Sequence, residues 1–222
     1  MTTQASSPPR TPQAKTVTRL ANGARPSMMH DGTPVGWEPC TPIRVMLYTP
    51  HMPAGGWNAI ATVLAEIHAA SGYAFKLTGA TSRTPSLDDD SGLLTIGWVT
   101  TSELRALDLQ PEPGLAGVGG ITAIGRHIES GFALIRANTH TTRSISRGVM
   151  GIIRHELGHA MGLDHVNDPR QIMFPVAHIG LPTRYGTGDL AGFRALAHAA
   201  CTHRTATNTT PTMPNRTTTA AS

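Results

Sequence analysis

The chain has 222 residues, of which 18 are Lys or Arg and 14 are Asp or Glu, and its sequence pI is about 9.6. The basic excess lies in the ends of the chain, because residues 37–201 hold 12 basic and 13 acidic residues. The predicted domain therefore has no basic stripe suited to specific nucleic-acid recognition, and the chain has no apolar run long enough for a transmembrane segment. We therefore expect no specific nucleic-acid partner and no membrane span.

Composition divides the chain into three parts. Residues 1–36 are rich in Thr, Ser, Pro and Gln, and residues 202–222 are mostly Thr, Ala, Pro and Asn. Neither end shows apolar periodicity, so neither can bury enough surface to offset the entropy of ordering it. We predict a disordered basic N-terminal tail over 1–36, one folded domain over 37–201 and a disordered Thr-rich tail over 202–222. We expect the protein to be a monomer.

Strand and helix patterns alternate along the predicted domain. Apolar–polar alternation and short apolar runs predict strands, whereas apolar residues at helical spacing predict helices. In chain order, these patterns predict a strand over 43–50, a helix over 58–71, strands over 73–78, 93–100 and 130–137, a helix from about 144 or 146 to 161, and a last helix from about 187–189 to 200. A Gly-rich segment, 114–125, precedes the last of these strands. This order suggests an α/β (α+β) sandwich around a mixed sheet, with two long helices and a C-terminal helix.

The stretch His155-Glu-Leu-Gly-His159-Ala-Met-Gly162-Leu-Asp-His165 carries the candidate chemistry. His155 and His159 are four residues apart, so on a helix both imidazoles project from one face and can bind a single ion. Glu156 lies at the edge of that face, within reach of a metal-bound water. Gly162 can adopt positive φ, which ends the helix and lets His165 return to the ion as the third ligand.

Three protein ligands leave a fourth position for water, as in catalytic zinc sites. We therefore predict one zinc ion held by His155, His159 and His165, and peptide-bond hydrolysis by a water that Glu156 activates. The alternative is a catalytically inactive module that holds zinc for binding, and the intact Glu156 argues against it. A basic nucleic-acid-binding protein is a third hypothesis, which the location of the basic residues weakens.

The pattern His-Glu-x-x-His-x-x-Gly-x-x-His resembles that of the metzincin zinc metallopeptidases. Met173, in Ile172-Met-Phe-Pro175, is similar to the methionine of their Met-turn, and the whole favours the matrixin-like branch. The resemblance implies that Met173 forms an apolar floor beneath the zinc. It also implies a secreted protein, although the N-terminus as written shows no apolar signal core.

The same resemblance implies a five-stranded twisted sheet, mostly parallel, with an antiparallel edge strand. A protein or peptide substrate would bind along that edge as an extended strand. We place the edge in the Gly-rich segment 114–125, for which a surface loop is the alternative. Residues 176–185 would form the wall of the pocket beyond the cut bond, and Ile179 and Leu181 suggest an apolar pocket.

Some positions depart from the metzincin pattern. Pro175 stands where astacin-like and serralysin-like members have a tyrosine, so zinc and backbone donors would stabilise the oxyanion, and Tyr185 is the alternative. Asp residues 88–90 could bind calcium, but a solvated acidic loop is the favoured interpretation. Three further histidines have no ligand spacing and are treated as ordinary: His68, His127 and His178.

Cys40 and Cys201 lie near the two ends of the predicted domain. One disulfide that closes the fold and two free buried thiols are both open interpretations. A disulfide would require an oxidising compartment.

Overall fold

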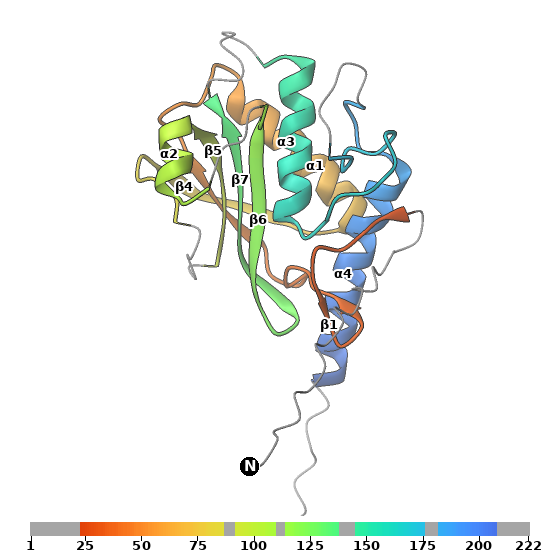
Figure 1. Ribbon diagram of the computed structural model, residues 1–222. Helices are drawn as coiled ribbons and strands as arrows, with labels where there is room; N and C mark the ends of the chain where they lie inside the picture. Colours follow the sequence, from red (N-terminus) through yellow and green to blue (C-terminus); the bar gives the residue numbers. More distant parts are fainter. Residues whose placement is uncertain (1–22, 87–91, 110–113, 138–144, 176–181, 208–222) are drawn as a thin grey trace, which may run out of the picture.

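The computed structural model describes residues 23–86, 92–109, 114–137, 145–175 and 182–207, with side chains as far as His198 (Figure 1). In chain order its elements are β1 (Met29–His30), β2 (Thr33–Pro34), β3 (Ile43–Tyr48), α1 (Gly56–Ser71), β4 (Phe75–Thr81), β5 (Leu93–Val99), α2 (Thr101–Ala106), β6 (Gly117–Ile124), β7 (His127–Arg136), α3 (Arg147–Ala160) and α4 (Thr187–Thr207). No helix within these ranges is long and apolar enough to cross a membrane.

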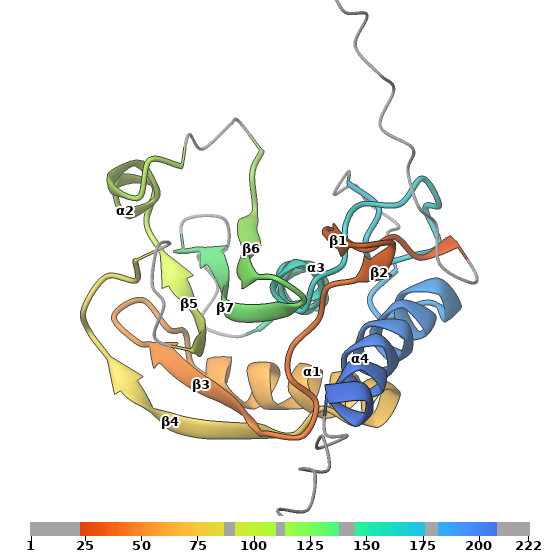
Figure 2. The same ribbon diagram turned by 90° about the horizontal axis from the view of Figure 1, so that it is seen from below.

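Five strands form one mixed, twisted sheet in the order β4-β3-β5-β7-β6 (Figure 2). β3 runs parallel to both β4 and β5, and β5 runs parallel to β7. β6 pairs antiparallel with β7 at the edge of the sheet and lies within the Gly-rich segment 114–125. The predicted α/β sandwich, mostly parallel with an antiparallel edge strand, is therefore confirmed.

The core lies between the sheet and the helices α1 and α3. Alternate side chains of the central strands, such as Val45 and Ile96, meet the apolar stripes of α1 and α3 in one buried cluster. Helix α4 packs against α1, and α3 packs against β6 and β7 (Figures 1 and 2). On the opposite face, Leu104 of α2 joins a smaller cluster with residues of β3, β5 and β7. This packing holds α3 along the edge of the sheet, where the candidate site lies.

The structure differs from the predicted boundaries at both ends of the domain. Residues 24–36 were assigned to the N-terminal tail, yet Ala24 and Val35 are buried and β1 and β2 form a hairpin. Their apolar residues are too scattered to show a periodicity, because two-residue strands offer too few positions for one. Helix α4 extends to Thr207 and so enters the predicted C-terminal tail. No Gly or Pro between Gly192 and Pro211 stops it earlier.

Helix α2 was not predicted, although the sequence carries its start signal. The Thr100 side chain accepts the Glu103 N–H at 3.2 Å, and the Glu103 carboxylate accepts the Thr100 N–H at 2.6 Å. This reciprocal pair is a capping box, which the order Thr-x-x-Glu encodes directly. The helix has six residues and one buried side chain, so no apolar stripe accompanies the cap.

Candidate metal centre

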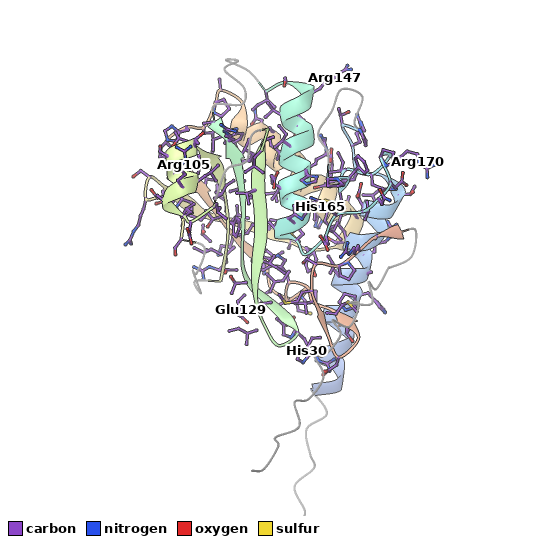
Figure 3. The ribbon with its side chains drawn as sticks, in the orientation of Figure 1. His30, Arg105, Glu129, Arg147, His165 and Arg170 are labelled. Atoms are coloured by element: carbon purple, nitrogen blue, oxygen red, sulfur yellow. The ribbon has the colours of Figure 1, made fainter. Side chains whose placement is uncertain are left out.

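Helix α3 presents two of the three candidate histidines. Ser146 caps the helix by accepting the Val149 N–H at 3.3 Å, so the helix begins at the second of the two predicted starts. Gly162 has a φ of 103°, as predicted, and the Leu163 N–H bonds back to the Gly158 carbonyl at 2.9 Å. The chain therefore turns after α3, and Figure 3 shows His165 beside the C-terminal half of this helix.

The Nε2 atoms of the three histidines converge on one point. The distances are 3.2 Å between His155 and His159, 3.2 Å between His155 and His165, and 3.1 Å between His159 and His165. Two nitrogens that bind one zinc at about 2.05 Å in tetrahedral geometry stand roughly 3.3 Å apart. The triangle therefore has the size that a tetrahedral metal ion requires. Within the described ranges, these three residues are the one group with such an arrangement.

Backbone carbonyls decide which ring nitrogens carry the protons. The Nδ1–H of His155 donates to the Ile172 carbonyl at 2.8 Å, and the Nδ1–H of His159 donates to the Leu163 carbonyl at 2.9 Å. Because a carbonyl only accepts, the Nε2 atoms of both neutral rings carry lone pairs. Two lone pairs 3.2 Å apart repel each other unless a cation lies between them. The donor set thus fits a metal ion bound through three imidazole nitrogens.

Burial keeps the three imidazoles neutral. It lowers the pKa of His155 and of His165, and it lowers the pKa of His159 to about 4. Neighbouring histidines contribute in the same direction at His155 and His159. At neutral pH all three rings are therefore free to act as ligands without first losing a proton.

The side chain of Glu156 extends from α3 toward the edge strand β6. Its side chain is buried, with 6% exposure, and burial raises its pKa to about 8. A Cβ added at Gly117 of β6 would lie 2.7 Å from Glu156 Cγ and 2.8 Å from its Oε1. A Cβ at Gly119 would overlap the Glu156 carbonyl oxygen. The two glycines, on one face of the strand, therefore allow α3 and its carboxylate to approach β6 closely.

Met173 is buried against α3, where its sulfur occupies the space that a side chain at Gly158 would fill. Asp189, in the first turn of α4, holds the segment around Met173. Its carboxylate accepts the N–H groups of Ile172 at 2.8 Å and Met173 at 3.3 Å, and also that of Gly186 at 2.8 Å. Since the Ile172 carbonyl orients His155, Asp189 acts on that ring through one peptide unit.

From the sequence, Asp189 was expected only to lie favourably at the positive end of the dipole of α4. The acidic residue in the first turn of a helix was visible in the sequence. Its bonds to the 172–173 peptides were not, because they join residues that lie 16 and 17 positions apart.

Tyr185 does not face the histidines. Its hydroxyl donates to the Arg154 carbonyl at 2.8 Å, and its ring packs edge-on against Phe193. Arg154 itself forms two bonds of 2.7 Å with Glu66, which ties α3 to α1. The suggested approach of Tyr185 to the site is therefore wrong, because its hydroxyl is committed to the backbone of α3.

The other residues considered in the sequence lie away from the three histidines or outside the described residues. Pro175 and Cys40 are exposed, and His68 Nδ1 pairs with the Tyr73 carbonyl at 2.8 Å. His127 Nδ1 lies 3.9 Å from Glu38. The positions outside the described residues are the acidic residues 88–90, His178, Ile179 and Leu181, and the side chain of Cys201.

Comparisons with known proteins agree with this geometry. The matrixin family model matches residues 94–196, which run from β5 into α4. Over 44 residues the chain is 52% identical to the macrophage metalloelastase of Oryctolagus cuniculus, and this match covers 19% of the chain and 10% of that protein. The chain thus spans about a tenth of the length of this curated relative. Together with the mixed sheet and the three convergent histidines on and after α3, these matches show that residues 94–196 form a matrixin-like metzincin region.

Proposed function

We propose that this protein is a zinc-dependent metalloendopeptidase whose single zinc ion is held by His155, His159 and His165. The observation that carries the proposal is the triangle of Nε2 atoms, 3.1–3.2 Å on each side, whose lone pairs converge. The backbone carbonyls of Ile172 and Leu163 orient two of the rings and set their tautomers. Zinc bound there supplies Lewis acidity and lowers the pKa of a water that it holds toward about 7.

Glu156 is the proposed general base. It follows His155 directly, and its carboxyl group lies in the narrow space beside Gly117. Burial raises the pKa of Glu156 to about 8 in the metal-free protein, and a zinc ion bound beside it would favour the carboxylate form that takes a proton. Glu156 takes the proton of the attacking water and gives it to the nitrogen of the departing amine.

The edge strand β6 is the proposed platform for the substrate. Within the described sheet, β6 pairs with β7 along one side only, so its other side offers backbone N–H and C=O groups. An extended peptide that adds to this edge runs past Gly117 and hence past Glu156. Backbone bonds of this kind give affinity for many sequences, so we expect cleavage of unstructured proteins with limited sequence preference.

The first test combines metal analysis with a cleavage assay. We expect one zinc per chain and cleavage of an unfolded protein substrate that a chelator abolishes and added zinc restores. Glu156→Gln should keep the zinc and lose roughly 10²- to 10⁴-fold in rate, the range that general acid–base catalysis contributes. Undiminished cleavage by Glu156→Gln would overturn the mechanism. Tight zinc binding without cleavage across a broad peptide library would favour the inactive zinc-holding module instead.

We also propose that the protein acts outside the cell as a monomer. The support is the match to the matrixin family, whose members are typically extracellular. Recovery of the protein from the culture medium and sequencing of its N-terminus would test export. Retention of all of the protein inside the cell would contradict it, and light scattering would measure the oligomeric state.

A further inference from the structure

The turn that carries the third histidine is held by a segment from the other end of the chain. His155 and His159 belong to α3, whose hydrogen bonds and core packing fix them. His165 follows Gly162 and lies outside any helix or strand, so other contacts must hold it in place. Residues 24–27, here called the N-terminal strap, supply such contacts, and they lie in the region predicted to be a disordered tail.

Backbone hydrogen bonds join the strap to the turn as a short antiparallel bridge between Pro26 and Leu163. The Ser27 N–H donates to the Gly162 carbonyl at 2.8 Å, and the Ser27 hydroxyl donates to the same oxygen at 3.0 Å. In the opposite direction, the Asp164 N–H donates to the Arg25 carbonyl at 2.8 Å. The polar groups on both sides of Leu163 are thereby satisfied by the strap.

Side chains extend the contact to His165 itself. The Arg25 Nε lies 3.1 Å from Asp164 Oδ2, and the other oxygen of the same carboxylate accepts the His165 N–H at 2.7 Å. The Arg25 and Asp164 side chains are 38% and 33% exposed, so this ion pair is weaker than the backbone bridge. It nonetheless fixes the carboxylate that bonds the His165 backbone.

The strap packs closely against α4 at a glycine. Ala24 and Pro26 are buried, and a Cβ added at Gly192 of α4 would lie 2.6 Å from Leu163 Cδ2 and 3.1 Å from Ala24 Cβ. Gly192 thus makes room for the strap and for the turn together. Both views show β1 and the segment before it beside α4 and the end of α3 (Figures 1 and 2).

We propose that the N-terminal strap positions His159 and His165 for metal binding by holding the turn 162–165. The turn serves two ligands, because its Leu163 carbonyl accepts the His159 Nδ1–H and its last residue is His165. Ser27 and Arg25 are therefore positioning residues that act through the turn. This inference rests on the proposed metal site and adds to it a segment far away in the sequence.

The test measures zinc affinity by competition with a chromophoric chelator, together with the visible absorption of the cobalt(II)-substituted protein, in the full chain. Ser27→Pro removes both the N–H and the hydroxyl that bond Gly162. We expect its zinc affinity to fall by about 10- to 100-fold, the range found when groups that orient ligands are lost, and its cobalt spectrum to change. Ser27→Thr keeps both groups, so its zinc affinity and cobalt spectrum should match those of the wild type.

Asp31→Asn is the matched control. Asp31 lies in the N-terminal hairpin β1–β2, and its replacement removes the exposed ion pair of 3.2 Å with Arg126. Asp31 does not contact the turn 162–165 in the described structure, so the zinc affinity should stay as in the wild type. Wild-type affinity and an unchanged cobalt spectrum in folded Ser27→Pro would overturn the inference. If Ser27→Pro does not fold, the double variant Arg25→Ala/Ser27→Ala leaves the backbone bridge intact and should still bind zinc more weakly. Equal affinity of this double variant would also overturn the inference, whereas no zinc binding by the wild type would overturn the proposed metal site itself.

Discussion

Glu156 is an ionisable residue that the fold buries, so its protonation state is coupled to the stability of the metal-free protein. Its carboxyl group is buried at the surface of α3, and this burial raises its pKa from 4.5 to about 8. The folded metal-free protein therefore keeps a proton on Glu156 between these pH values, whereas the unfolded chain releases it. A group with a raised pKa stabilises the fold fully below the lower value, and this contribution is lost as the pH rises toward the higher one.

We therefore expect the metal-free Glu156→Gln variant to gain stability over the wild type as the pH rises from about 5 to 8. Gln cannot ionise, so the free energies of unfolding of the two proteins should diverge by up to about 1.4 kcal/mol per pH unit. Denaturant titrations of both metal-free proteins at several pH values measure this difference. Bound zinc favours the carboxylate form and should narrow the gap. A gap that does not change with pH would contradict the burial of an ionisable group here.

Gly117 controls where that carboxylate can lie. Because a Cβ at position 117 would meet the flexible end of Glu156, Gly117→Ala should displace the carboxyl group and leave the fold intact. Displacement by about 1 Å can lower the rate on the order of 10²-fold. We expect this loss in kcat/KM with one zinc per chain retained.

Gly79→Ala is a suitable control, because the new Cβ on β4 would make an ordinary contact of 3.8 Å with Met46. Zinc content and kcat/KM should both remain at wild-type values in this variant. If Gly117→Ala were as active as Gly79→Ala, Glu156 would not depend on the space beside β6.

At the scale of elements, the segment 171–173 depends on the first turn of α4. One buried carboxylate, that of Asp189, accepts three backbone N–H groups, and its own N–H bonds the Gln171 side chain at 3.1 Å. Burial raises the pKa of Asp189 above its ordinary value, and the backbone N–H bonds offset only part of this rise. The helix end therefore serves as an anchor for the loop that carries Met173 and orients His155.

Asp189→Asn should loosen this anchor. The amide group of Asn has one oxygen and cannot accept all three N–H groups, so at least one buried donor loses its partner. Such a loss costs about 1–3 kcal/mol of unfolding free energy. We also expect weaker zinc binding, because the Ile172 carbonyl that holds His155 moves with the loop. Thermal unfolding and chelator competition measure the two effects.

Asp168→Asn serves as the control for Asp189→Asn. Asp168 lies in the same loop and pairs with Arg170, whose side chain is 87% exposed. Its replacement should change stability and zinc affinity little. Equal effects of the two substitutions would show that Asp189 has no special role in the loop.

The helices and strands differ in how far local sequence predicts them. Helix α3 combines an N-cap serine, an apolar stripe and a glycine stop, so its type and both ends could be predicted. Helix α2 has one buried residue and was missed, and the strap and the hairpin β1–β2 were assigned to a tail. Short segments of this kind are stabilised by partners that are distant in sequence, which local patterns do not contain.

At the scale of the whole molecule, the site joins four separate segments of the chain. Helix α3, the turn 162–165 and the segment 171–173 meet at three imidazoles. The strap holds the turn through backbone bonds, and α4 holds the 171–173 segment through Asp189. A metal ion that binds all three rings should therefore stabilise the global fold and not the site alone.

We expect the free energy of unfolding to rise by about 1.4 kcal/mol for each tenfold increase in free zinc above the dissociation constant. Thermal unfolding in a series of zinc buffers measures this dependence. His165→Ala removes one ligand and should weaken the response, while the metal-free stability of the two proteins stays comparable. A wild-type Tm that is independent of zinc would contradict the proposed site.

Residue spacing alone was enough to predict the chemistry that we propose for this site. The spacing of His155, Glu156 and His159 on a helix, followed by Gly162 and His165, indicates three ligands, a carboxylate and a turn, because these relations span only eleven residues. The order of strands and helices was likewise enough for the fold class.

The contacts that hold these residues in place became visible in the folded structure. It placed Gly117 beside Glu156, Asp189 beneath the 171–173 segment and Ser27 on the Gly162 carbonyl. Each of these contacts joins positions that lie between 17 and 135 residues apart, and hydrogen bonding across such separations depends on the packed core. The pattern of the proposed catalytic site is therefore local in the sequence, whereas the residues that orient it come from distant parts of the described chain.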